Sequence, residues 1–350
     1  PSWQLLTPRH RPDSTLAGEL VFALKWEGVD LAVLAALFKS VPAGDIAAIV
    51  RATPTGGFAR RIWFLYEWLT GRELDVGAPG KVRMVTVVDP RLQVSAERGT
   101  SSSRHRVVDN LPGTPRFCPM IRWTPALCSA VAAGYDRRAR EIIGRVHSNL
   151  VARAAAFLLL NDSKSSFAIE GERASGARAA RWAEAIGQAG AQPLTLPELE
   201  RLQRLVIGDA RFVRLGLRDD GGFVGTHDRR TREPIPEHIS ARPQDLPELV
   251  AGIIDYAERA IGGGVDAVMA AAVIAFGFVY VHPFVDGNGR LHRWLIHHVL
   301  AAAGYNPPGL VFPVSAVILR RLDDYRRVLE SYSRPLRSFI DWRATEVGNG

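Results

Sequence analysis

One segment of twelve residues combines groups that act together in phosphate chemistry. Residues 282–293 read HPFVDGNGRLHR. Asp286 offers carboxylate oxygens suited to Mg²⁺, which proteins usually bind through one or two carboxylates together with substrate phosphates. His282, four residues earlier, is placed to take a proton from an attacking hydroxyl group. The segment therefore predicts a site at which a hydroxyl group attacks a phosphate.

The Gly-Asn-Gly stretch at residues 287–289 predicts an anion-binding turn. Two of its three residues lack a Cβ atom, so the backbone can turn tightly and point successive N–H groups at one anion. Apolar residues recur at helical spacing from Leu291 onward, which predicts a helix whose positive end faces the same anion. Arg290 and Arg293 lie three residues apart, on one face of the first turn, where both can reach phosphate oxygens.

Each of these features has an ordinary explanation when it is taken alone. A Gly-Asn-Gly stretch is usually only a turn, and a histidine before a proline is often a loop residue. Phe284 is interpreted as the anchor that holds the loop to the core. The three other histidines of the segment and the helix behind it lack the H-E-x-x-H spacing of a zinc protease, so they are interpreted as packing or helix-surface residues: His292, His297 and His298.

The combination resembles the signature of Fic domains, H-x-F-x-(D/E)-G-N-G-R-x-x-R, at every defined position. The resemblance implies a mostly helical fold that transfers AMP from ATP to a Ser, Thr or Tyr hydroxyl group of a target protein and releases pyrophosphate. His282 would be the general base and Asp286 the Mg²⁺ ligand. Family members that transfer a phosphate have lysine at the second glycine of the loop. Gly289 is a glycine here, which favours AMP transfer.

The resemblance also implies where the nucleotide binds. Residues 287–289 would form the anion hole, and the two arginines would hold the distal phosphates. A tyrosine on the helix that follows the catalytic one falls where family members contact the adenine. The predicted nucleotide-binding residues are Gly287, Asn288, Gly289, Arg290, Leu291, His292, Arg293 and Tyr325.

Residues 166–171, SFAIEG, resemble the inhibitory motif of the family, (S/T)-x-x-x-E-(G/N). The resemblance implies that Glu170 pairs with Arg293 and competes with the γ-phosphate for the same guanidinium group, so that ATP binds poorly. In isolation, Ser166 before an apolar turn would be an ordinary helix start. Together with the loop, the motif predicts a self-inhibited enzyme with Ser166, Glu170 and Gly171 as its inhibitory residues.

A flap is predicted at about residues 211–243. Glycines and prolines punctuate a segment in which β-prone runs flank a charged tip, which indicates a hairpin, with a plain surface loop as the alternative. In the family a flap at this place clamps the target by backbone hydrogen bonds, as in strand addition. The predicted docking residues are Ile239, Ser240 and Ala241.

Composition limits the classes of partner and compartment. The chain has 350 residues, 47% of them hydrophobic, and a formal charge of +8. Its basic residues are dispersed among acidic ones, so no nucleic-acid partner is predicted. No run of 18 apolar residues occurs, so no membrane span is predicted. Cys118 and Cys128 fit no metal or redox spacing, which favours free thiols and a cytoplasmic location.

The fold class is predicted as mainly α, with a Fic-type helical core, a β-hairpin flap and an N-terminal helical module with short β pieces. The module should span residues 1–124 and the catalytic domain residues 125–350. Apolar spacing predicts helices over residues 19–41, 138–160 and 265–281, and a strand pair within residues 81–94. The module could recognise the target, mediate homodimerisation or brace the inhibitory helix.

Two other functions are consistent with these residues. Glu170 could orient a water molecule that removes AMP from a modified target, alone or beside the transfer reaction. The chain could instead be a regulatory module that binds a nucleotide without turnover. The presence of His282 argues against that module, because a pure binder has no need of a base.

Overall fold

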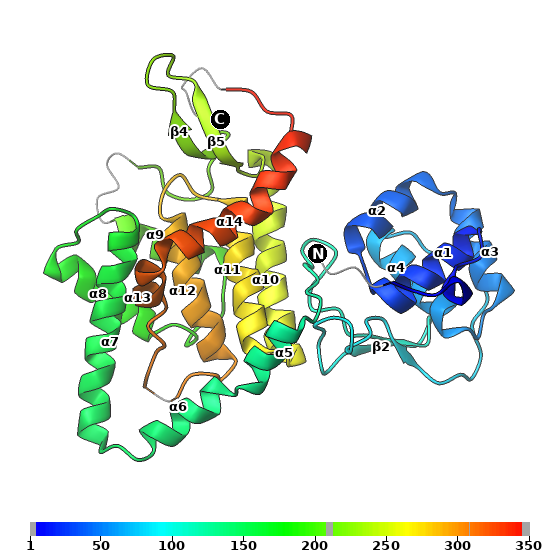
Figure 1. Cartoon of the computed structure of the whole chain (residues 1–350), viewed down its shortest axis with the longest axis horizontal. Coiled ribbons are helices and arrows are strands. Elements are labelled where there is room, and N and C mark those ends of the chain that lie inside the picture. Colours follow the sequence, from blue (N-terminus) through cyan, green and yellow to red (C-terminus); the bar gives the residue numbers. More distant parts are fainter. Residues whose placement is uncertain (1–4, 208–212, 308, 345–350) are drawn as a thin grey trace. The chain divides into compact units, whose positions relative to one another are not determined.

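The computed structural model describes residues 5–207, 213–307 and 309–344. The first four and last six residues of the predicted domains, and the first two of the predicted flap, lie outside the described residues. The chain divides into two compact units, one made of residues 1–128 and 262–265 and the other of residues 129–261 and 266–350. The fold is mainly helical with two small sheets, as predicted (Figure 1).

The first unit begins with helices that pack around one central helix. The predicted helix over residues 19–41 is interrupted, because Gly28 adopts a left-handed conformation with φ of 87°. The side chain of Asp30 then accepts a hydrogen bond from the N–H of Val33 and begins the next helix. The central helix is α4, whose Trp63 and Tyr66 are buried. The helices are α1 (Leu16–Phe22), a short π-helical turn (Ala23–Glu27), α2 (Leu31–Ser40), α3 (Ala43–Ala52) and α4 (Gly57–Thr70).

The sheet of the first unit differs from the prediction. Only β1 (Val85–Thr86) forms within residues 81–94, and it pairs in parallel with β3 (Val107–Asp109), which pairs antiparallel with β2 (Thr100–Ser102). The predicted second strand does not form within residues 81–94. Just after β1, the side chain of Asn110 takes up the backbone hydrogen bonds of Val88 in place of a second strand. Its amide group accepts from the N–H of Val88 and donates to the C=O of the same residue, at 2.8 and 3.0 Å.

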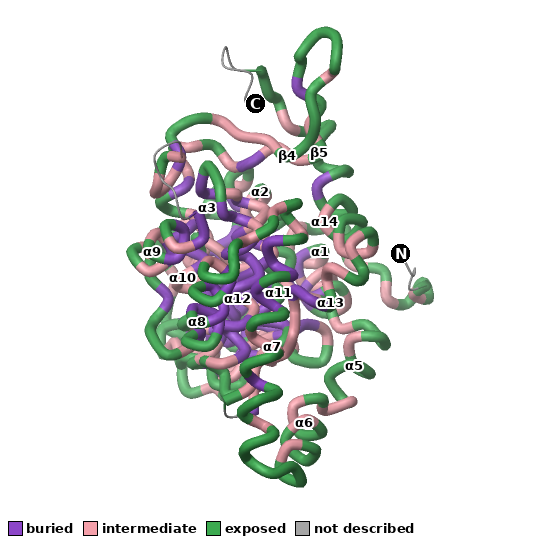
Figure 2. The backbone as a smooth tube through the Cα atoms, turned by 90° about the vertical axis from the view of Figure 1, so that its left-hand side faces the viewer, coloured by how far each residue is buried: buried purple, intermediate pink, exposed green. Residues whose placement is uncertain are grey.

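The second unit is built around two adjacent helices, α11 and α12, most of whose residues are buried (Figure 2). The predicted buried helix ending at Val281 is confirmed as α11. The two-stranded sheet is β4 (Phe223–His227) paired antiparallel with β5 (Pro234–Ile239). Residues 125–128 of α5 and 262–263 of α10 are counted with the first unit. The helices are α5 (Pro125–Ala132), α6 (Tyr135–Ile143), α7 (Ser148–Ile169), α8 (Gly176–Gly187), α9 (Leu196–Ile207), α10 (Leu246–Gly263), α11 (Ala267–Val281), α12 (Asn288–Ala302), α13 (Val314–Arg320) and α14 (Leu322–Leu336).

The predicted helix over residues 138–160 is two helices. α6 ends where the N–H of Gly144 donates to the C=O of Arg140, and α7 begins where the His147 ring accepts from the N–H of Asn149. α7 then continues to Ile169, which places residues 166–169 of the predicted inhibitory motif on its last turn. It packs against α8 and α13.

Among the described residues, no single helix is both long and apolar enough to cross a membrane. The bent pair α2 and α3, with 110° between its helices, passes that test only when the two are taken together.

A buried carboxylate connects three helices of the second unit. Asp162 of α7 is fully buried, and one of its oxygens lies 3.0 Å from Nε2 of His297 on α12. Its other oxygen accepts from the N–H of Ala316, in the first turn of α13, also at 3.0 Å. Asp162 therefore holds α12 and α13 against α7, and α12 carries the predicted nucleotide-binding residues.

We expect Asp162→Ala to lower the melting temperature strongly. Removing the carboxylate leaves the N–H of Ala316 and the ring of His297 buried without their hydrogen-bond partner, and each such loss costs about 1 to 3 kcal/mol. Asp162→Asn is the matched control, since it keeps an acceptor for the N–H of Ala316 and should lose less. Thermal unfolding followed by circular dichroism checks this, and an Ala variant as stable as wild type would contradict it.

Candidate functional site

His282 lies directly after α11 in a conformation unusual for a residue with a side chain. Its φ and ψ are 53° and 60°, in the left-handed region, and its N–H donates to the C=O of Phe278 at 3.0 Å. Nδ1 of the ring lies 3.3 Å from the C=O of Val279, so Nδ1 is assigned the proton. Nε2 is then left as the proton acceptor.

Burial lowers the pKa of His282 to about 4, because the charged imidazolium loses its hydration. The nearby Arg218 and His238 lower this pKa further, whereas the C=O of Val279 and the carboxylate of Glu170 raise it. The ring is therefore neutral at pH 7 and able to accept a proton.

Arg218 holds the backbone of His282 in place, and no sequence pattern indicated this role. Its guanidinium group is buried and donates to the C=O of His282 at 2.8 Å, to the C=O of Asp220 at 2.6 Å and to the C=O of Ala241. Its own N–H donates to the C=O of Pro283 at 3.0 Å. One side chain thus connects the candidate base to the segment that follows β5.

The loop between α11 and α12 is closed by its own asparagine. The side-chain amide of Asn288 donates to the C=O of Phe284 at 2.7 Å and accepts from its N–H at 3.0 Å. Phe284 is fully buried, as expected of an anchor. Gly287 has a φ of 95°, and α12 begins at the next residue, so the prediction of a turn that opens a helix is confirmed.

The predicted partners Glu170 and Arg293 form an ion pair. Nη2 of Arg293 lies 2.8 Å from Oε1 of Glu170, and Arg293 also donates to the hydroxyl and the C=O of Ser166, at 3.1 and 2.8 Å. Ser166 lies near the end of α7, so the alternative of a helix start is wrong. A Cβ atom on Gly289 would lie 2.3 Å from Oε1 of Glu170, which means that the carboxylate sits against the glycine turn.

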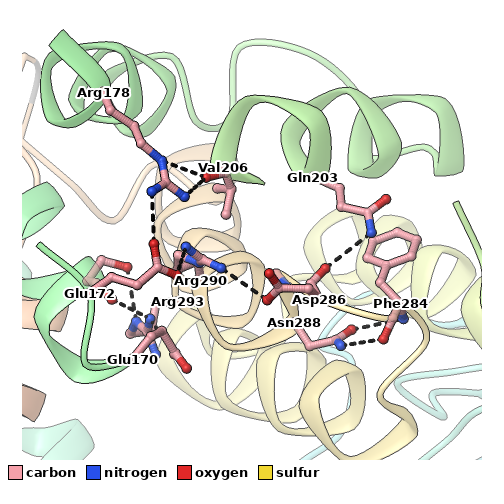
Figure 3. A network of polar contacts seen from close by, with 12 residues as sticks. Glu170, Glu172, Arg178, Gln203, Val206, Phe284, Asp286, Asn288, Arg290 and Arg293 are labelled. Atoms are coloured by element: carbon pink, nitrogen blue, oxygen red, sulfur yellow. Dashed lines mark hydrogen bonds and ion pairs between the residues drawn. The ribbon is translucent and has the colours of Figure 1, made fainter. Parts of the chain in front are cut away.

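The other arginine has different partners from those expected. Arg290 lies in a row of alternating charges, with Nη2 3.1 Å from Oδ1 of Asp286 and Nη1 2.6 Å from Oε1 of Glu172 (Figure 3). Oε2 of Glu172 in turn lies 2.8 Å from Nη1 of Arg178. Neither Glu172 nor Arg178 was singled out from the sequence, because both lie far from the loop along the chain.

Glu170, His282 and Arg293 border one cleft of about 290 Å³, whereas Asp286 and Arg290 are not part of its lining. Tyr325 lines it, and burial raises the pKa of its hydroxyl group while the charge of Arg293 partly offsets this rise. Side chains of the flap and of α11 complete the wall. The cleft residues include Glu170, His282, Gly289, Arg293, Tyr325, Val224, Glu237, His238, Phe276 and Tyr280.

Five predicted nucleotide contacts are not part of this cleft lining: Gly287, Asn288, Arg290, Leu291 and His292. All five are buried. The ring of His292 is near the C=O of Ala275, with 2.7 Å between Nδ1 and the oxygen, and so joins α12 to α11. His292, His297 and His298 are all buried, so the interpretation as packing residues holds and the alternative of a helix surface is wrong.

The flap is a hairpin, although its pairing is irregular. A bulge lies between Val224 and Gly225, and Gly225 pairs with Pro236. A Cβ atom on Gly225 would lie 2.3 Å from the carbonyl oxygen of Ile235, so the two strands approach closely here. Two of the three predicted docking residues already use their backbone N–H groups internally: Ser240 donates to Gly222 and Ala241 to Val281. Only Ile239 lies within β5, so free backbone groups for a target peptide must come from the strands before residue 240.

The described residues contain no group of three or more His, Cys, Asp or Glu side chains that could hold a metal ion. Asp286 could hold a metal ion together with substrate phosphates. Its carboxylate is half exposed, and within the described part of the chain only its Oδ1 is engaged, by Arg290 and by the N–H of Gly287.

Part of this chain is similar to known proteins. The sequence profile of the Fic/DOC family matches residues 193–300. A protein named protein adenylyltransferase Fic from Drosophila willistoni is 30% identical over 114 residues, which are 33% of this chain and 21% of that protein. A protein of the same name from Nematostella vectensis is 27% identical over 160 residues, 44% of this chain and 33% of that protein. The chain thus spans about a fifth of the Drosophila relative.

Solved structures of Fic proteins are also similar. A Fic family protein from Desulfovibrio desulfuricans G20 matches with a TM-score of 0.46 and 23% identity, over 61% of this chain and 68% of that one. Fic-1 from C. elegans, residues 134–508, matches with a TM-score of 0.37 and 15% identity, over 87% of this chain and 96% of that one. The match to the Fic/DOC family covers the loop that carries His282, Asp286 and the glycine turn, so this part of the chain is similar to that family.

Proposed function

We propose that this chain is a self-inhibited protein adenylyltransferase. It transfers AMP from ATP to a hydroxyl group of a target protein in the cytoplasm. The observation that carries the proposal is the partly buried His282, whose Nδ1 faces the C=O of Val279, in the same cleft as Arg293 and Gly289. A base, a cationic side chain and a glycine turn at a helix N-terminus are the groups that an attack on a phosphate requires.

In the proposed reaction, the oxygen of a target Ser, Thr or Tyr hydroxyl group attacks the α-phosphorus of ATP. A bond forms between that oxygen and the phosphorus, and the bond from the phosphorus to the bridging oxygen of the β-phosphate breaks. The hydroxyl proton passes to Nε2 of His282, and pyrophosphate leaves with the electron pair of the broken bond. The backbone turn at residues 287–289 holds the phosphate, since its N–H groups and the start of α12 favour negative charge.

Mg²⁺ belongs to this proposal with Asp286 as its ligand from the protein. The free Oδ2 would bind the ion, while Arg290 holds Oδ1 in place. A bound Mg²⁺ would neutralise negative charge on the phosphates. The target would lie along the hairpin, where β4 and β5 offer backbone groups for strand addition before residue 240.

Self-inhibition is proposed from the position of Glu170. Its carboxylate contacts Arg293 and lies against Gly289, where the phosphates of ATP would have to bind. Two anions cannot share one guanidinium group and one glycine turn without strong repulsion. ATP therefore has to displace Glu170, which lowers its affinity.

We expect His282→Ala to reduce AMP transfer by about 10²- to 10⁴-fold, the usual loss when a general base is removed. Nucleotide binding should stay nearly the same, because the imidazole acts on the attacking hydroxyl group. Transfer of a fluorescent AMP analogue to protein, together with calorimetric titration of ATP, measures both effects. Equal transfer rates for variant and wild type would exclude His282 from the mechanism, whatever the affinity for ATP.

We expect Glu170→Gly to raise the affinity for ATP and the rate of self-modification or target modification, because the competing carboxylate is removed. Each should rise by about tenfold or more, which corresponds to about 1.4 kcal/mol. Arg293→Ala is the matched control, because it breaks the same ion pair but also removes the phosphate ligand, so it should stay inactive. If both variants melted earlier than wild type and neither gained activity, the pair would be structural and the inhibitory assignment would fail.

A further inference from the structure

The segment after α7 presents two carboxylates to two arginines. Glu170 contacts Arg293 at 2.8 Å, and Glu172 contacts Arg290 at 2.6 Å. The carboxylates are two residues apart, and the arginines are three apart in the first two turns of α12. Both guanidinium groups are at most 2% exposed, so each needs an anionic partner that reaches it inside the protein.

Glu172 is held from both sides, unlike a surface carboxylate. Arg178 of α8 contacts Oε2 at 2.8 Å and also donates from Nε to the C=O of Val206 at 3.1 Å. The guanidinium groups of Arg178 and Arg290 both lie over the ring of Phe167, at 4.6 and 5.4 Å from its centre. Glu172 therefore bridges two cations that the fold keeps near one another (Figure 3).

Arg290 still has a donor to give. Its Nε is buried and has no hydrogen-bond partner within the described part of the chain. Its two Nη atoms are occupied by Glu172 and Asp286. One of the carboxylates on Arg290 is that of Glu172, which belongs to the same segment as Glu170. If that segment moves, Arg290 can bind a second anion in place of Glu172.

On the basis of the proposed function, we propose that Glu172 is a second inhibitory carboxylate. Together, Glu170 and Glu172 offer two negative charges to the two arginines, in the place of the two distal phosphates of ATP. Because both carboxylates belong to one turn, the pair of Glu172 with Arg290 also keeps Glu170 against Arg293. Release of either one loosens the other, and ATP competes with the two together.

The test is calorimetric titration of a nonhydrolysable ATP analogue and of AMP into wild type, Glu172→Gln, Glu170→Gly and the double variant. Glu172→Gln keeps the size of the side chain and removes its charge. It should bind the analogue about tenfold more tightly than wild type, and the double variant more tightly than Glu170→Gly. AMP should bind wild type and Glu172→Gln within about twofold of one another, because it lacks the distal phosphate that the Glu172 carboxylate replaces.

Glu198→Gln is the matched control, since it removes a carboxylate that pairs with Arg201 on the partly exposed face of α9. It should bind both nucleotides as wild type does. Should Glu172→Gln fold poorly, Glu172→Asp shortens the reach to Arg290 and should shift the affinity in the same direction by less. Unchanged or weaker binding of the analogue to Glu172→Gln overturns the inference. If Glu170→Gly also shows no gain, the proposed self-inhibition itself fails, whereas a gain in Glu170→Gly alone rejects only the role of Glu172.

Discussion

The central constraint in this structure is a buried arginine that needs an anion. Arg293 lies in the second turn of α12 with almost no exposure to water, and a guanidinium group cannot give up its charge in a protein. Either a carboxylate or a phosphate must therefore accompany it. Glu170 supplies the carboxylate from the end of α7, and the hydroxyl and carbonyl groups of Ser166 complete the environment. The pairing of Glu170 with Arg293 thus follows from the cost of burying an unpaired charge.

The candidate base depends on a second set of contacts. His282 adopts a left-handed conformation that costs energy for a residue with a Cβ atom, and the surrounding backbone must compensate for that cost. The C-terminal turn of α11, the asparagine-closed loop and the guanidinium group of Arg218 supply these contacts. Because Arg218 also donates to the C=O of Ala241, the position of the base and the end of the flap are connected.

The sequence predicts well the parts of the site that lie close together along the chain. The glycine turn, the helix after it and the buried helix before it are all visible as local patterns within residues 265–303. The pairing of Glu170 with Arg293 follows from the resemblance to Fic domains and not from any local pattern. Periodicity also predicts that both units are mainly helical, but it misplaces helix ends where Gly28 or Gly144 interrupts an apolar pattern.

The contacts that the sequence does not indicate span large separations. Glu172 and Arg290 are 118 residues apart, Asp162 and His297 are 135 apart, and Arg218 and His282 are 64 apart. An exposed glutamate and a bridging one look the same in a sequence, because only the fold brings a cation to either side of it. Likewise, the sequence offers free backbone groups at Ser240 and Ala241, whereas the fold uses them to attach the flap.

The most direct test of the central claim is the position of the label that the protein retains. A chain without the Glu170 carboxylate, incubated with Mg²⁺ and ATP labelled at either the α- or the γ-phosphate, should keep the α label on protein and release the γ label in pyrophosphate. Retention of the γ label would show phosphate transfer and contradict the proposed reaction. Absence of both labels from the chain and from a panel of candidate target proteins would favour a nucleotide-binding module without turnover.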